Sequence, residues 1–132
     1  MSYRMSFAFG VPAVTVRVGQ RFTLADAERM LRALATNLGG RPATALLVDL
    51  TGAALISPPH EWAAIGALLH ECSEFRAHAI AMLAASPGQC AAARAVSVQA
   101  EKAGVSMAAF RDREEAVAWL GAAITGASPA SA

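Results

Sequence analysis

The chain has 132 residues and a mass of 13.6 kDa, enough for one domain that buries about two-thirds of its unfolded surface. Eleven basic and ten acidic residues are mixed along the sequence and give a net charge of +1, which argues against a nucleic-acid partner or a basic membrane patch. Hydrophobic residues make up 55% of the chain, but Asp49 and residues 86–89 interrupt the apolar runs before the roughly 18 residues that a membrane span requires. No signal-peptide pattern follows Arg4, so we expect a cytoplasmic protein without membrane insertion.

The N-terminal residues predict a β-hairpin followed by a helix. Residues 7–9 form a short strand candidate, and residues 13–18 alternate between apolar and polar side chains, which is typical of a half-buried strand. Thr23 then stands where it can cap a helix, with Asp26 as its capping-box partner. The apolar face of that helix extends to Leu38.

Two further strands and two helices follow. Residues 45–50 form an apolar run broken only by Asp49, which indicates a central strand buried on both faces. A helix begins after this strand at Pro58 or Pro59, because proline suits a first helical turn. Residues 78–85 predict the next strand.

The next helix has a signal at each end. Residues 86–89 form a second capping box with proline in the first turn, and the helix extends to Ala103, where Gly104 ends it. The two ends therefore define one helix between two strands.

The C-terminal part predicts a final strand, residues 105–110, and a final helix. Asp112 can cap that helix and Glu115 completes a capping box. Trp119 and Leu120 share the apolar face of the helix, so we expect them to pack against a sheet.

The complete order is ββαβαβαβα, an α/β fold. Because strands joined by single helices pair in parallel through right-handed crossovers, we predict a mixed sheet of about five strands in which only the first hairpin is antiparallel. We predict one domain over residues 1–125 and a disordered tail over residues 126–132. Leu47, Ile80 and Trp119 are expected in one connected core, and Trp119→Ala is expected to cost roughly 3–5 kcal/mol.

The strand, cap and terminal Trp-Leu helix over residues 110–120 resemble the ending of the SpoIIAA-like (STAS/SEC14-type) family of small bacterial domains. Residues 47–52 (Leu-Val-Asp-Leu-Thr-Gly), 79–81 and 100–104 add to the resemblance, as does the element order, over roughly residues 23–121. The resemblance implies a regulatory or protein-interaction module that is not an enzyme. The SEC14 part of the family name implies an alternative function. In that alternative, the domain binds a lipid or another small apolar ligand in a cavity beside the alanine-rich helices.

The candidate partner or ligand loop comprises five residues: Asp49, Thr51, Gly52, Ser57 and His60. Ligands and partners of open α/β sheets meet the edge formed by the carboxyl ends of the strands, and Asp49 and Thr51 stand where one of these strands ends. The alternative interpretation is structural, with the Asp49 carboxylate satisfying N–H groups of the loop.

In anti-sigma-factor antagonists of this broad family, the next helix opens with a phosphorylatable serine. Ser57 is the only hydroxyl in the corresponding stretch, one position early, and Pro58 and Pro59 occupy the expected phosphosite region. We therefore interpret Ser57 as a helix N-cap rather than a phosphorylation switch, and Thr51 as the better acceptor.

Other chemistry has weak support in the sequence. His70, Glu74 and His78 lack the spacing of a metal site, and Cys72 and Cys90 read as two free thiols. Neither a nucleophile motif nor a phosphate-binding motif is present. We predict no catalytic residue, metal or cofactor, and a homodimer because the apolar content is high.

Overall fold

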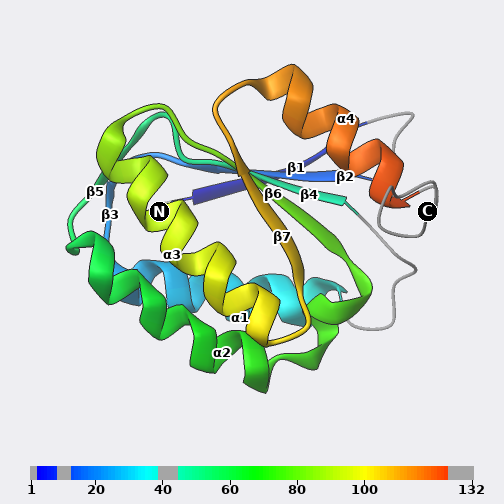
Figure 1. Ribbon diagram of the computed structural model, residues 1–132, viewed down its shortest axis with the longest axis horizontal. Coiled ribbons are helices and arrows are strands. Elements are labelled where there is room, and N and C mark those ends of the chain that lie inside the picture. Colours follow the sequence, from blue (N-terminus) through cyan, green and yellow to red (C-terminus); the bar gives the residue numbers. More distant parts are fainter. Residues whose placement is uncertain (1–2, 9–12, 39–44, 125–132) are drawn as a thin grey trace.

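The computed structural model describes residues 3–8, 13–38 and 45–124, and its main sheet has five strands in the order β1-β2-β4-β6-β7 (Figure 1). In chain order these strands are β1 (Tyr3–Ala8), β2 (Ala13–Val18), β4 (Ala45–Asp49), β6 (Ala79–Leu83) and β7 (Ser106–Phe110). β1 and β2 pair antiparallel, and every other neighbouring pair is parallel. The predicted α/β fold with one antiparallel hairpin is confirmed, while the right-handed sense of the crossovers stays a prediction.

A second, two-stranded sheet was not predicted. It pairs β3 (Gln20–Phe22) with β5 (Ala53–Leu55) in parallel. Both strands have only three residues, too few to produce a readable alternation. β5 lies in the loop that follows β4, so its pairing with β3 positions the candidate site.

Four α-helices and two 3-10 helices complete the described elements. They are α1 (Leu24–Leu38), η1 (Pro59–Ala64), α2 (Ile65–Glu71), η2 (Ser73–Ala77), α3 (Pro87–Lys102) and α4 (Arg113–Ile124). The helix expected to begin at Pro58 or Pro59 therefore starts as a 3-10 helix, whose first bond runs from the Glu61 N–H to the Pro58 carbonyl at 3.0 Å. Such tighter turns are common where an α-helix begins.

Both predicted capping boxes that the structure tests are confirmed. The hydroxyl of Thr23 accepts from the Asp26 N–H at 3.1 Å, and the Asp26 carboxylate accepts from the Thr23 N–H at 3.0 Å. Ser86 and Gln89 make the equivalent pair at the start of α3. Each box satisfies amides that have no partner within the first helical turn.

The helices cover the two faces of the main sheet unequally, with α4 on one face and α1, α2 and α3 on the other (Figure 1). Because successive strand residues point to opposite faces, the core divides into two clusters. Ile80 belongs to the larger cluster, whereas Leu47 packs with Leu120 on the α4 face. The prediction that Leu47, Ile80 and Trp119 share one core is therefore wrong.

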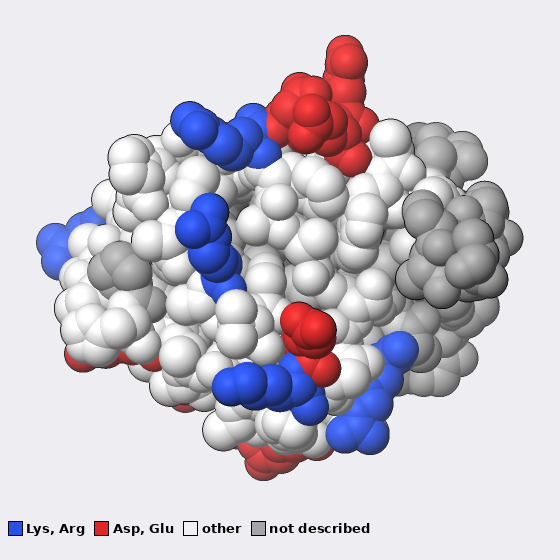
Figure 2. All heavy atoms as spheres, viewed as in Figure 1, with Lys and Arg blue, Asp and Glu red and all other residues white. Residues whose placement is uncertain are grey.

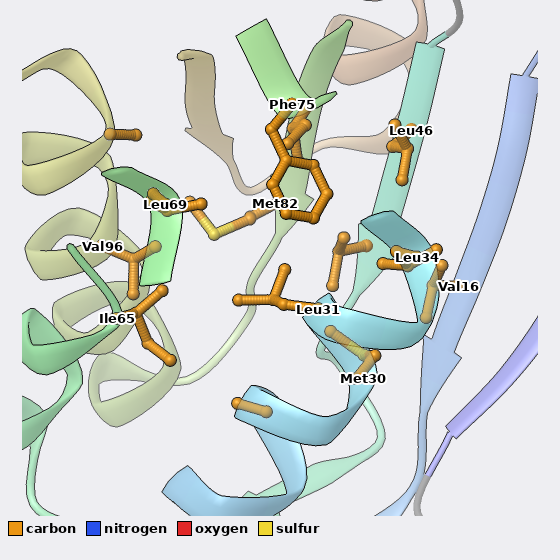
Figure 3. Packing of buried hydrophobic residues seen from close by; sticks show 14 of the residues in the cluster. Val16, Met30, Leu31, Leu34, Leu46, Ile65, Leu69, Phe75, Met82 and Val96 are labelled. Atoms are coloured by element: carbon orange, nitrogen blue, oxygen red, sulfur yellow. The ribbon is translucent and has the colours of Figure 1, made fainter. Parts of the chain in front are cut away.

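The larger cluster fills the space between the sheet and three helices. Figure 3 shows Leu31 of α1 pointing toward Ile65 and Val96, with Met82 of the sheet nearby. These side chains are buried, so α1, α2, α3 and the sheet are held by one continuous set of contacts.

The two tryptophans lie in different environments. Trp62 is only 4% exposed and stacks on Phe22, with ring centroids 5.9 Å apart. Trp119 is half-buried and packs against Phe110 at the side of β7, with centroids 5.6 Å apart. Trp62 is therefore the large aromatic anchor of the core, and the role assigned to Trp119 was wrong because its helix places it beside an edge strand.

Two positions require glycine, one because of its backbone conformation and one because two helices approach each other closely there. Gly104 has a φ of +77°, the left-handed conformation that ends α3 as predicted. A Cβ on Gly66 would lie 2.8 Å from the Gln99 side chain, so this glycine allows α2 to approach α3 closely.

Some expectations fall outside the described residues: Phe9, the turn over residues 10–12 and the tail over residues 126–132. The single domain over residues 1–125 stays a prediction for the same reason. Among the helices described, none is both long and apolar enough to span a bilayer.

Candidate functional site

Asp49 ends β4 and organises the loop that follows it. Its side chain lies almost completely inside the fold, with the residue only 6% exposed. One carboxylate oxygen, Oδ1, accepts hydrogen bonds from the Thr51 N–H at 2.9 Å and from the Thr51 hydroxyl at 2.6 Å. The interpretation of Asp49 as an acceptor for loop amides is confirmed, and the hydroxyl bond adds to it.

The second oxygen of Asp49 faces two arginines from other elements. Oδ2 lies 3.9 Å from Arg17 Nε on β2 and 3.7 Å from Arg113 Nη1 at the start of α4. At these distances, and with both arginine side chains at least half exposed, each pair contributes little to stability. No local signal in the sequence indicates the Arg17 contact, because it depends on the parallel register that aligns Arg17 with Asp49.

The loop between β4 and η1 has a fixed backbone. The Leu50 N–H donates to the Leu83 carbonyl at 2.9 Å, and the Ile56 N–H donates to the Phe22 carbonyl at 3.0 Å. Between these two points, β5 pairs with β3. The loop is therefore held at both ends and in the middle.

Gln89 ties this loop to the start of α3. It is buried, and its Nε2 donates to the Ala53 carbonyl at 2.8 Å and to the Thr51 carbonyl at 3.4 Å. Its Oε1 accepts from the Ala85 and Ser86 amides at 2.8 and 3.1 Å. The sequence indicated the capping role of Gln89, but the reach to Ala53 spans 36 positions and had no local signal.

Ser57 does not cap the helix that follows it, so that prediction was wrong. Pro58 is the N-cap of η1 and makes no side-chain capping bond. The helix begins one residue later than the capping interpretation required, and the Ser57 hydroxyl instead accepts from the Leu24 N–H at 3.1 Å. The Ser57 carbonyl accepts from the Trp62 indole N–H at 3.1 Å, so both of these Ser57 groups have partners inside the fold.

The outer surface of the loop consists of exposed residues on this fixed backbone. We call it the β4 loop surface; its members are Thr51, Gly52, Ala54 and Ile56 of the loop and the adjoining His60 of η1. Ile56 is 45% exposed and is one of three large hydrophobic residues so exposed in the described part of the chain. The structure thus joins Asp49 to Thr51 directly, whereas Ser57 is tied to α1.

The described residues give no support to a metal site or to a reactive thiol. Those residues contain no group of three or more histidine, cysteine, aspartate or glutamate side chains able to hold a metal ion. Cys72 is buried, Cys90 is half-buried and both are free thiols, as predicted. Burial raises the pKa of the Cys72 thiol, with Glu74 adding to the effect, which lowers its reactivity.

The fold and the loop at the carboxyl end of β4 define a small domain of the STAS type. The SpoIIAA-like family model matches residues 13–121, and the chain belongs to the SpoIIAA-like family. Its fold is similar to that of an uncharacterized protein with a SpoIIAA-like fold from Shewanella loihica PV-4. The two share 22% sequence identity at a TM-score of 0.58, and the match covers 89% of this chain and 91% of that one. No curated protein matches the chain.

Proposed function

We propose that the protein is a bacterial, cytoplasmic regulatory or interaction module, without enzymatic activity, that docks a protein partner through the β4 loop surface. The observation that carries the proposal is the exposed side chain of Ile56 on a backbone that is already held by Phe22. An apolar anchor surrounded by polar neighbours such as Thr51 and His60 is the usual pattern of a small protein interface.

The fixed backbone supports the proposal on energetic grounds. A loop that orders only on binding loses conformational entropy at that moment, which weakens the complex. Here the Gln89 bond to Ala53 and the pairing of β5 with β3 order the loop beforehand. The partner therefore meets a preformed surface, and binding does not have to offset that entropy loss.

The test compares two matched substitutions of exposed β-branched residues. Ile56→Asp lies in the β4 loop surface, and Val117→Asp lies on α4 with a similar exposure, 49% against 45%. Tagged wild type and both variants are purified from the native host, and a co-purifying protein is then produced separately and titrated calorimetrically. We expect Ile56→Asp to weaken binding at least about tenfold and Val117→Asp to leave it unchanged. Equal affinity of all three proteins for every partner would contradict the proposal.

A second candidate function rests on an apolar cavity between the sheet and the helices. It measures about 60 Å³ and its lining is entirely apolar, with Ala27, Ala92 and Ala93 among the small side chains that leave it open. An apolar cavity that binds a ligand as small as benzene measures about 150 Å³. The alternative of a lipid or small apolar ligand therefore requires the cavity to open, which makes it the weaker candidate.

Three methionines in the cavity lining report on that alternative. Met30, Met82 and Met107 line the cavity, so their methyl NMR signals respond to an occupant. Titration with decanoate, a single-chain fatty acid, would shift these signals and saturate if the domain binds apolar ligands. Unchanged methionine signals up to the solubility limit would remove this candidate.

We also propose that the module is a homodimer. Val98 is exposed, and Trp119 is covered on only part of its surface, so the monomer leaves apolar area that a second copy can bury. Sedimentation at tens of micromolar protein is expected to give the mass of a dimer, and a monomer at that concentration would contradict the proposal.

A further inference from the structure

The small sheet places an arginine beside the β4 loop surface. β3 and β5 lie side by side (Figure 1), and their parallel register pairs Arg21 with Ala54. The Ile56 N–H donates to the Phe22 carbonyl at 3.0 Å and so extends this pairing beyond β5. Because successive strand residues alternate between the two faces of a sheet, Arg21, Ala54 and Ile56 share one face. All three are exposed whereas Phe22 and Ala53 are buried, so the outer face of the small sheet joins a cation to exposed apolar side chains.

The guanidinium of Arg21 is available to a carboxylate of another molecule. In the described part of the chain, the arginines that form ion pairs are Arg17, Arg29, Arg32 and Arg113, so Arg21 has no carboxylate partner among these residues. In Figure 2 the left edge of the molecule, where β3 and β5 lie in Figure 1, carries a basic side chain with no acidic side chain against it in this view. Arg21 therefore keeps its N–H donors for a partner.

The nearest arginine on the preceding strand shares its carboxylate. Arg17 of β2 and Arg113 of α4 face the same Oδ2 atom of Asp49, at 3.9 and 3.7 Å, and the other oxygen of Asp49 is occupied by Thr51. Figure 2 shows a group of acidic side chains over the start of α4, at the top of the view and away from β3 and β5. The flank of the β4 loop surface formed by β2 and β3 is therefore positively charged.

We propose that the partner of the β4 loop surface is a protein that presents an acidic side chain beside an apolar one. The inference rests on the proposed docking function and names the chemistry of the partner. The carboxylate pairs with Arg21, whose planar guanidinium can bind it through two parallel hydrogen bonds, and the apolar side chain covers Ile56. Strands about 4.8 Å apart with a rise of about 3.3 Å per residue place the Cα atoms of Arg21 and Ile56 about 8 Å apart. Neighbouring side chains of one partner segment can therefore reach both.

The contact with Ile56 strengthens the ion pair that the partner makes. An ion pair that stays in water contributes little, because the solvent screens it. An apolar side chain that closes over Ile56 excludes water from one side of the pair and lowers the local dielectric, which increases the attraction. The arrangement of Arg21 and Ile56 on one face therefore favours a partner that supplies both groups.

A carboxylate is favoured over the phosphates of a nucleic acid. Nucleic-acid surfaces gather many cations, whereas this chain has a net charge of +1. The exposed neighbours of Arg21 on its face of the small sheet are Ala54 and Ile56, which offer nothing to a phosphate backbone.

Peptide titrations test the chemistry of the partner without requiring its identity. The probe is the acidic peptide Glu-Leu-Glu-Leu-Glu, capped at both ends, and its matched control is Lys-Leu-Lys-Leu-Lys. We expect the acidic peptide to shift the NMR signals of the Arg21 side chain and the Ile56 methyl groups in a saturable way, and the basic peptide to leave them unchanged. Equal shifts with both peptides, or no shift up to the solubility limit of the acidic one, would overturn the inference.

Charge reversal separates Arg21 from the other arginines. Arg21→Glu is expected to weaken binding of the acidic peptide at least about tenfold and to create binding of the basic peptide. Arg94→Glu is the matched control, because Arg94 is an exposed arginine of α3 that also forms no ion pair with the described residues. It should leave the affinity for the acidic peptide unchanged. Equal losses in the two variants would reveal a general attraction to the charge of the protein and would contradict the inference.

The partner that co-purifies with the protein separates this inference from the proposed function. If Ile56→Asp and Arg21→Glu both weaken its binding, and Arg21→Glu also reduces the dependence on salt, both stand. If Ile56→Asp weakens binding and Arg21→Glu does not, the docking function stands and the acidic partner is wrong. If neither variant changes the affinity, both are wrong. Loss of the interaction after nuclease treatment would identify a nucleic acid and would also refute the acidic protein.

Discussion

The carboxylate of Asp49 holds both the backbone amide and the hydroxyl of Thr51, at 2.9 and 2.6 Å. This pair turns the chain where β4 ends, and the turn presents Gly52 and the rest of the β4 loop surface to solvent. The same carboxylate faces Arg17 and Arg113. Asp49 therefore links the candidate docking loop to β2 and α4.

Asp49→Ala is expected to destabilise the fold by about 2 kcal/mol, because it removes a charged acceptor from two hydrogen bonds at a buried position. Thr51→Val keeps the shape of the side chain and loses only the hydroxyl bond, so about 1 kcal/mol is expected. Urea unfolding of both single variants and the double variant measures the coupling. Additive losses would show that the hydroxyl bond contributes nothing.

Ser57 is expected to carry no phosphate in protein purified from its native host. Its hydroxyl oxygen accepts from the Leu24 amide at 3.1 Å and the side chain is only partly exposed, while a kinase needs an accessible hydroxyl positioned in line with the γ-phosphate. Thr51 is exposed and is the better acceptor if modification occurs. Intact-mass and peptide mass spectrometry measure both positions. Stoichiometric phosphate on Ser57 that changed partner binding would restore the switch interpretation.

Trp62→Ala is expected to cost about 3–5 kcal/mol, the range for a large buried aromatic residue. The indole is stacked on Phe22 and donates to the Ser57 carbonyl, so the substitution leaves a cavity and an unpaired acceptor. Trp119→Ala, measured below the dimerisation concentration, is expected to cost about 1–2 kcal/mol because half-buried positions lose less. Urea melts of the two variants rank them, and a larger loss for Trp119→Ala would mean that the α4 face is misassigned.

Asp26 is expected to make the protein less stable in acid. The Thr23 N–H lowers the pKa of this carboxyl below its ordinary value of 3.8, and Arg29 adds to the effect. A depressed folded-state pKa contributes stability that is present above the unfolded-state pKa and is lost as the pH falls through the folded-state value. Urea midpoints of wild type and Asp26→Asn should therefore converge as the pH falls below about 4. A difference that stayed constant with pH would show that the charge of Asp26 has no role in the cap.

Much of the fold was predictable because its signals are local. The partners of the Thr23–Asp26 and Ser86–Gln89 capping boxes are only three positions apart, so the sequence alone places both helix starts. The apolar run over β4 likewise indicated a buried central strand, and all five of its residues are buried. Three-residue strands such as β3 and β5 carry too little pattern to be recognised.

The sequence by itself determined which of the longer segments become strands and helices, and that Asp49 and Thr51 stand at a strand end. Only the tertiary structure decided what those side chains contact. Ser57 bonds to Leu24, 33 positions away, and Gln89 to Ala53, 36 positions away, because strand order and register, not local pattern, bring such residues together. The same holds for Trp119, which lies at an open edge instead of in the core because β7, the strand beside it, is the last in the sheet.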